Sequence, residues 1–165
     1  MRPTAGFYGG RSEQATLCVE IPMSPDPEAR PLLFRAAVLM VLAFPTGVLV
    51  SGAMTDKIPA DPHMMLASHL NAILGALWMV AVAWSLPMTR LGPEGRARLV
   101  TGVTIANYSN WLITLIKAFL KVSGVDYIGE PLNDMVFAGL TLFVVLPSFV
   151  VAGAWAWSLG GERKE

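Results

Sequence analysis

The chain has 165 residues, of which 54% are hydrophobic and only 15% are charged, and its mean hydropathy is +0.54. A soluble domain normally carries about a quarter charged residues, so this composition indicates an integral membrane protein. Twelve basic residues balance twelve acidic ones, which gives no argument for a nucleic-acid partner, and Cys18 as the single cysteine excludes an intrachain disulfide and metal sites built from several thiolates.

Residues 1–31 are mixed and polar in composition, with glycines and several prolines. They lack the continuous apolar core of a secretory signal. We therefore predict a loose cytoplasmic tail here, and we expect the first apolar stretch to serve as its own insertion signal.

Four apolar stretches follow, at about residues 35–53, 64–87, 99–120 and 135–159. Each is close to the ~20 residues that a helix needs to cross a bilayer. The sequence therefore predicts an all-α membrane protein, with a four-transmembrane-helix bundle over residues 32–160 and a polar tail at 161–165. Pro45 and Pro147 are expected to kink the first and fourth helices, and Lys117 is expected to extend to the lipid headgroups.

The basic residues are distributed unevenly over the two sides of this bundle. Nine Lys and Arg lie on the side that holds the two tails and the second loop, against three on the opposite side. Cytoplasmic segments carry the excess of basic residues, so we expect both termini in the cytoplasm and a multi-pass protein of the inner cell membrane, in contact with the lipid bilayer. Trp84, Trp155 and Trp157 lie near the same helix ends, where indole rings favour the interface.

His69 lies about one turn inside the second stretch, whose residues 66–86 include no Asp, Glu, Lys or Arg. An ionisable side chain is costly there unless a partner or a cofactor compensates it. His69 can be a neutral imidazole packed between helices, or a metal ligand. No second histidine follows three or four residues away, so a metal would need a cofactor's ligands, as a porphyrin supplies for iron with one axial imidazole. The sequence leaves both interpretations open.

The third stretch carries three polar residues on one helical face. Asn107, Asn110 and Thr114 are spaced i, i+3 and i+7. Such residues can hydrogen-bond neighbouring helices, or together they can line a cavity, and the pattern favours neither. His69 is expected at about the depth of Thr114, so a pocket shared by His69, Asn110 and Thr114 is permitted.

Three segments resemble a known family, the bacterial styrene oxide isomerases. In the family's second helix a histidine opens a helix that ends in an AVAxxLP run, and residues 69–87 are similar, reading HLNAILGALWMVAVAWSLP. The family's ARLL and aromatic-Ser-Asn elements resemble residues 96–111, RARLVTGVTIANYSNW, and its GDIF resembles residues 133–137, NDMVF. The resemblance covers about residues 35–160.

This resemblance implies a four-helix membrane enzyme that forms trimers and binds haem b through that histidine. The ferric iron acts as a Lewis acid on an epoxide oxygen, and a hydride shift then gives a carbonyl product without net redox change, a Meinwald-type rearrangement. His69 falls on the haem ligand and Asn110 on a pocket asparagine. We therefore expect ferric haem b, a hydrophobic small-molecule substrate and a homo-oligomer, with Asn110 and either Asn107 or Thr114 positioning the substrate.

The sequence departs from the family's pattern at three pocket positions. The family's tyrosine falls on Thr114, its aspartate on Ala106 and its helix-two asparagine on Gly75. Loss of an aromatic ring and an asparagine side chain predicts a wider cavity, and hence a substrate bulkier than styrene oxide.

Two other interpretations remain open. One is a membrane haem b protein that transfers electrons or senses a gas. The other is a cofactor-free membrane interaction subunit, in which His69 is only a packed polar residue.

Overall fold

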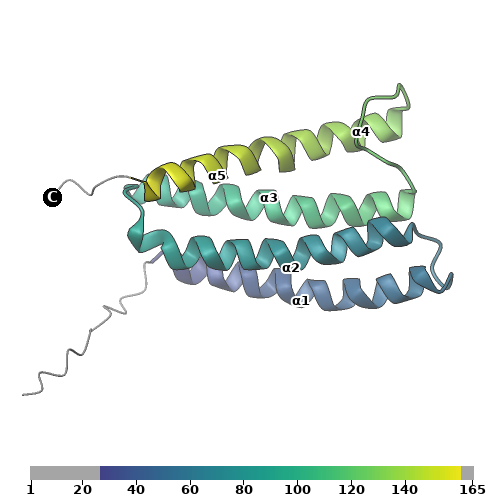
Figure 1. Ribbon diagram of the computed structural model, residues 1–165, viewed down its shortest axis with the longest axis horizontal. Coiled ribbons are helices and arrows are strands. Elements are labelled where there is room, and N and C mark those ends of the chain that lie inside the picture. Colours follow the sequence, from purple (N-terminus) through teal and green to yellow (C-terminus); the bar gives the residue numbers. More distant parts are fainter. Residues whose placement is uncertain (1–26, 161–165) are drawn as a thin grey trace, which may run out of the picture.

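The computed structural model describes residues 27–160, and this part of the chain is all helical with no strand (Figure 1). Most of the predicted N-terminal tail and the C-terminal tail at 161–165 lie outside the described residues. The helices are α1 (Ala29–Met54), α2 (Pro62–Ser85), which the short 3-10 turn η1 (Leu86–Met88) extends, α3 (Pro93–Leu120), and a fourth built from α4 (Pro131–Leu140), the π turn η2 (Thr141–Val145) and α5 (Leu146–Leu159).

Four helices in the described residues are long and apolar enough to cross a membrane, which confirms the predicted all-α class and the number of spanning-length helices. The first, third and fourth begin about a turn or more earlier than the apolar pattern predicts. Their first turns contain charged residues that a hydropathy pattern leaves outside the helix. Residues 29–31, assigned to the tail from sequence, are therefore the first turn of α1.

Proline and aspartate set the starts of the later helices. Pro62, Pro93 and Pro131 each occupy the first turn, where a missing backbone N–H costs nothing. The Asp61 carboxylate also caps α2 by accepting a hydrogen bond of 2.9 Å from the Met64 backbone N–H. These residues place His69 about two turns inside α2.

The helices lie roughly antiparallel, with α1 beside α2, α3 on the other side of α2, and α4 with α5 packed along α3 (Figure 1). Small residues bring α1 and α2 close together, since Ala36, Ala43, Ala72 and Ala76 are all buried. The main core cluster also contains large aliphatic side chains from the first three helices: Leu32, Leu39, Met79, Val82 and Val103.

Large apolar side chains remain exposed along the outer faces of α1 and α5. Phe34, Phe44 and Val48 are exposed on α1, and Phe149 and Val150 on α5. Such continuous apolar faces fit lipid or another copy of the chain better than water. The single chain therefore presents the surface expected of a membrane protein.

The two intrahelical prolines have different effects. Helix α1 continues through Pro45. Pro147 instead lies in the first turn of α5, two residues after the π turn η2 ends at Val145. A proline ring clashes with the carbonyl four residues earlier in an α-helix, here that of Phe143, and the wider turn relieves this clash. Pro147 thus changes the hydrogen bonding of the fourth helix without ending it.

Lys117 corrects one expectation from the sequence. The residue is only 5% exposed, so its side chain packs between helices and is not extended away from them. Asp61, at the start of α2, lies close enough to interact electrostatically with it. The helix pairing explains the difference, because the end of α3 lies against the start of α2, where the Asp61 N–H donates to the Ala118 carbonyl.

Candidate functional site

The imidazole of His69 is half-buried and faces α1. Its Nδ1 atom lies 2.9 Å from the carbonyl oxygen of Ala43. A carbonyl oxygen can only accept, so Nδ1 carries the proton and donates it, and in the neutral ring Nε2 keeps a lone pair. Metal-ligating histidines commonly show this arrangement, in which one ring nitrogen donates to a carbonyl and the other binds the metal.

Gly47 provides the surface on which the His69 ring packs. A Cβ atom at Gly47 would lie 3.0 Å from Cε1, 3.3 Å from Nδ1 and 3.6 Å from Nε2 of His69. A side chain there would therefore push against the ring. Sequence analysis did not identify Gly47, although the small residues Ala43, Gly47 and Ser51, each four apart, mark a helix face that a bulky neighbour can approach.

Trp111 joins α3 to α1 and α2 directly beside this histidine. Its Nε1–H donates to Thr46 Oγ1 at 3.1 Å, and its backbone carbonyl accepts from Ser68 Oγ at 3.0 Å. Thr46 is 2% exposed and Ser68 is fully buried. Because Thr46 precedes Gly47 and Ser68 precedes His69, these bonds fix the two helices at the level of the imidazole.

A second polar cluster lies between α2 and α3. Asn71 Nδ2 donates to Asn110 Oδ1 and to Thr114 Oγ1, both at 3.2 Å. The predicted polar face of α3 thus meets a polar residue on α2. The other amide ends, Asn71 Oδ1 and Asn110 Nδ2, have no hydrogen-bond partner within residues 27–160, so the pair offers one acceptor and one donor to a ligand.

Asn107 fills the space beside Gly75. Its Nδ2 donates to the Val103 carbonyl at 2.7 Å, and a Cβ atom at Gly75 would lie 2.7 Å from its Oδ1. Asn107 is 6% exposed, and its neighbour Ala106 is buried. The prediction that Gly75 adds volume to a cavity is therefore wrong, because the Asn107 side chain occupies this space. The prediction of a bulkier substrate remains a prediction that rests on Thr114 alone.

The two clusters face different neighbours of α2. His69 contacts α1, whereas Asn71 contacts α3, as expected for positions about 200° apart around a helix. No hydrogen bond joins His69 to Asn110 or Thr114 within the described residues. The pocket that the sequence permits between these three residues therefore stays a prediction.

His69 also stands apart from other metal-binding side chains. Within the described part of the chain, no group of three or more His, Cys, Asp or Glu could hold a metal ion. A metal bound at His69 would need its remaining ligands from a cofactor, which is what a porphyrin provides.

Comparisons with known proteins identify the family of the chain. The family model described as styrene oxide isomerase matches residues 28–160. Among curated proteins, hydroxylaminobenzene mutase HabB of Ectopseudomonas oleovorans is 25% identical over 150 residues, which cover 87% of this chain and 88% of that protein. No solved structure matched the chain. Because the family model spans all four long helices, the chain belongs to the styrene oxide isomerase family.

Proposed function

We propose that this protein is a membrane isomerase or mutase that rearranges a small oxygen-bearing molecule without net redox change. Its family is described as styrene oxide isomerase, and its curated relative as a hydroxylaminobenzene mutase, so both descriptions denote intramolecular rearrangements. The four long apolar helices fit a multi-pass protein. Basic residues lie around the start of α1, around the start of α3 and in the sequence that follows α5. This distribution favours both termini on the cytoplasmic side of the inner membrane.

We propose His69 as the axial ligand of haem b. The observation that carries this proposal is the hydrogen bond from Nδ1 to the Ala43 carbonyl, which leaves Nε2 able to bind iron. The half-buried position and the flat surface at Gly47 fit a ligand held in one orientation. A ferric haem bound there would supply a Lewis acid able to polarise a C–O or N–O bond.

Asn110, with Thr114 and Asn71, is proposed to orient the substrate. Asn71 holds the Asn110 amide by donating to its Oδ1 atom, and Asn71 in turn donates to Thr114 Oγ1, so the Asn110 Nδ2 group stays available as a donor. A donor fixed in an apolar environment stabilises developing negative charge more strongly than one in water. Asn107, whose amide is committed to Val103 and packed at Gly75, contributes mainly to helix packing in this proposal.

We further propose a homo-oligomer, with the trimer as the state that the family resemblance implies. His69 is bonded to α1, whereas Asn110 is bonded to Asn71 on the α3 side of α2, and this separation favours a site that a second copy completes. The exposed apolar side chains of α1 and α5 are surfaces that such a copy can cover.

The substrate class has two candidates. An epoxide follows from the family description, and an aryl hydroxylamine from the name of the curated relative. In either case a bond to oxygen breaks within one molecule, and no external electrons are consumed.

An absorption spectrum tests the cofactor. The full chain, purified in detergent from haem-replete cells, should show a Soret band that disappears in His69→Ala. His63→Ala is the matched control, because His63 is exposed in the first turn of α2. Absence of haem from the wild-type chain would reject haem ligation and favour the cofactor-free interaction subunit.

Turnover without added reductant tests the reaction. Aryl and bulkier epoxides and aryl hydroxylamines should be compared with the haem-loaded protein in the absence of any electron donor. Product formation supports a rearrangement and identifies the class. A haem protein that acts only with reductant would instead be an electron carrier.

A further inference from the structure

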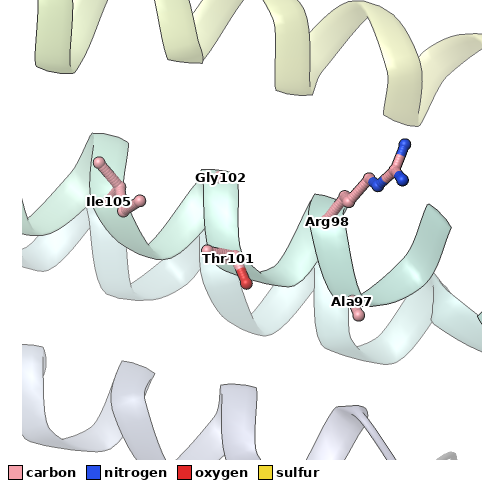
Figure 2. A pocket seen from close by; sticks show the side chains of 5 residues that line it. All are labelled: Ala97, Arg98, Thr101, Gly102 and Ile105. Atoms are coloured by element: carbon pink, nitrogen blue, oxygen red, sulfur yellow. The ribbon is translucent and has the colours of Figure 1, made fainter. Parts of the chain in front are cut away.

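A shallow groove runs along the surface of α3, away from His69. It has a volume of about 390 Å³ and is lined by residues of α3 alone: Ala97, Arg98, Thr101, Gly102 and Ile105 (Figure 2). Arg98 lies at the end nearest the start of the helix, and Ile105 about two turns deeper. The groove is thus cationic at one end and largely apolar along its length.

Neighbouring helices lie close on both sides of this part of α3. A Cβ atom at Gly102 would lie 2.6 Å from Val151 Cγ2, so α5 packs directly against α3 at the glycine. On the other side Arg35 of α1 donates from Nη1 to Thr104 Oγ1 at 3.4 Å. A second guanidinium therefore lies within about one turn of the groove.

The charge of the surrounding helix ends is positive. Within residues 27–160, this end of the molecule contains two glutamates, Glu28 and Glu94, and five arginines: Arg30, Arg35, Arg90, Arg96 and Arg98. The opposite end contains five carboxylates and three lysines. An anionic ligand is therefore attracted to the groove's end of the molecule.

The Arg98 guanidinium is available to such a ligand. Its ion-pair partner is Glu94, at a single contact of 3.4 Å, and the two side chains are 84% and 89% exposed. Pairs this exposed contribute little stability. A phosphate diester can take two parallel hydrogen bonds from a guanidinium, which is the stronger arrangement.

We propose that this groove binds one anionic phospholipid, with its phosphate on Arg98 and one acyl chain along Thr101, Gly102 and Ile105. The ligand must be anionic at one end and apolar over the rest. Its anionic end must lie at the end of the molecule where α3 begins. A membrane phospholipid satisfies all three conditions, whereas free phosphate leaves the apolar part of the groove unused. This site is independent of the proposed isomerase function.

Native mass spectrometry of the full chain, transferred to detergent with added lipid, tests the proposal. Phosphatidylglycerol and phosphatidylcholine with the same acyl chains serve as probes. The wild-type chain should retain one phosphatidylglycerol in preference to phosphatidylcholine. Arg98→Gln should weaken this retention about fivefold, Arg98→Lys should lie between the two, and Glu94→Gln should strengthen it.

Two further variants separate the groove from general charge. Arg30→Gln removes an exposed arginine at the same end and should leave retention unchanged. Thr101→Phe fills the apolar part and should reduce retention of both lipids, with helix content by circular dichroism confirming the fold. Equal retention of both lipids by the wild type, or equal losses in Arg98→Gln and Arg30→Gln, would overturn the proposal. Assemblies that change size in Thr101→Phe without lipid loss would assign the groove to a contact between copies instead.

Discussion

His69 Nδ1 donates to the backbone carbonyl of Ala43, and this bond of 2.9 Å crosses from α2 to α1. A backbone acceptor fixes which ring nitrogen carries the proton without adding a charge to the apolar interior. The free Nε2 atom is then presented in one orientation. Pairing α1 with α2 therefore holds the imidazole in place through a neutral hydrogen bond.

Gly47→Ala should weaken haem binding about 10- to 100-fold, and Gly47→Leu should abolish it, because a side chain at this position displaces the His69 ring. Haem titration followed at the Soret band measures the effect. Gly153→Ala is the matched control, since a Cβ atom at this helical glycine meets nothing within 4 Å. Equal affinities for Gly47→Ala and Gly153→Ala would show that the ring does not depend on Gly47.

Trp111→Phe should lower the free energy of unfolding by about 0.5–1.5 kcal/mol, because the Nε1–H bond to Thr46 is lost while the aromatic packing stays. A double-mutant cycle with Thr46→Val, measured by reversible unfolding in detergent, isolates the pair. The loss of unfolding free energy in the double variant should be smaller than the sum of the losses in the two single variants. Strict additivity would mean that this bond contributes nothing to the attachment of α3 to α1.

The number and class of the long helices could be predicted because apolar length alone determines them. Their starts could not, since charged first turns such as the one containing Arg30 are helical but not apolar. The burial of Lys117 was also missed, because it depends on which helix end lies opposite, and a single stretch does not contain that information.

The candidate site could be predicted only in part. The α3 face carrying Asn110 and Thr114 followed from helical periodicity, and the structure brings both onto Asn71. The relation between His69 and this face could not be predicted, since depth along a helix says nothing about which neighbour a side chain faces. The small residues Ala43, Gly47 and Ser51 mark a face that a neighbour can approach, but they do not show which side chain packs there, so the role of Gly47 and of the Ala43 carbonyl was missed.

Asn110→Ala should lower the turnover number of the rearrangement about a hundredfold or more while leaving the Soret band unchanged. The reason is that Asn110 offers a free donor to the substrate but makes no hydrogen bond to His69 within the described residues. Steady-state kinetics and the absorption spectrum of the same sample measure both quantities. If Asn110→Ala loses haem together with activity, its role is in folding or cofactor binding and not in orienting the substrate.

Gly75→Ala should destabilise the protein by about 1–3 kcal/mol, because the new methyl group lies 2.7 Å from Oδ1 of Asn107. The Asn107 side chain cannot easily move away, since its Nδ2 group donates to the Val103 carbonyl of its own helix at 2.7 Å. Adding Asn107→Ala to this variant should restore much of the loss, since it vacates the space that the methyl group needs. Thermal unfolding in detergent, with Gly153→Ala as the control for helix propensity, measures both steps. An open cavity at Gly75 would accept the methyl group without loss of stability, and Asn107→Ala would then have nothing to restore. If Asn107 fills the space beside Gly75, the two substitutions compensate each other.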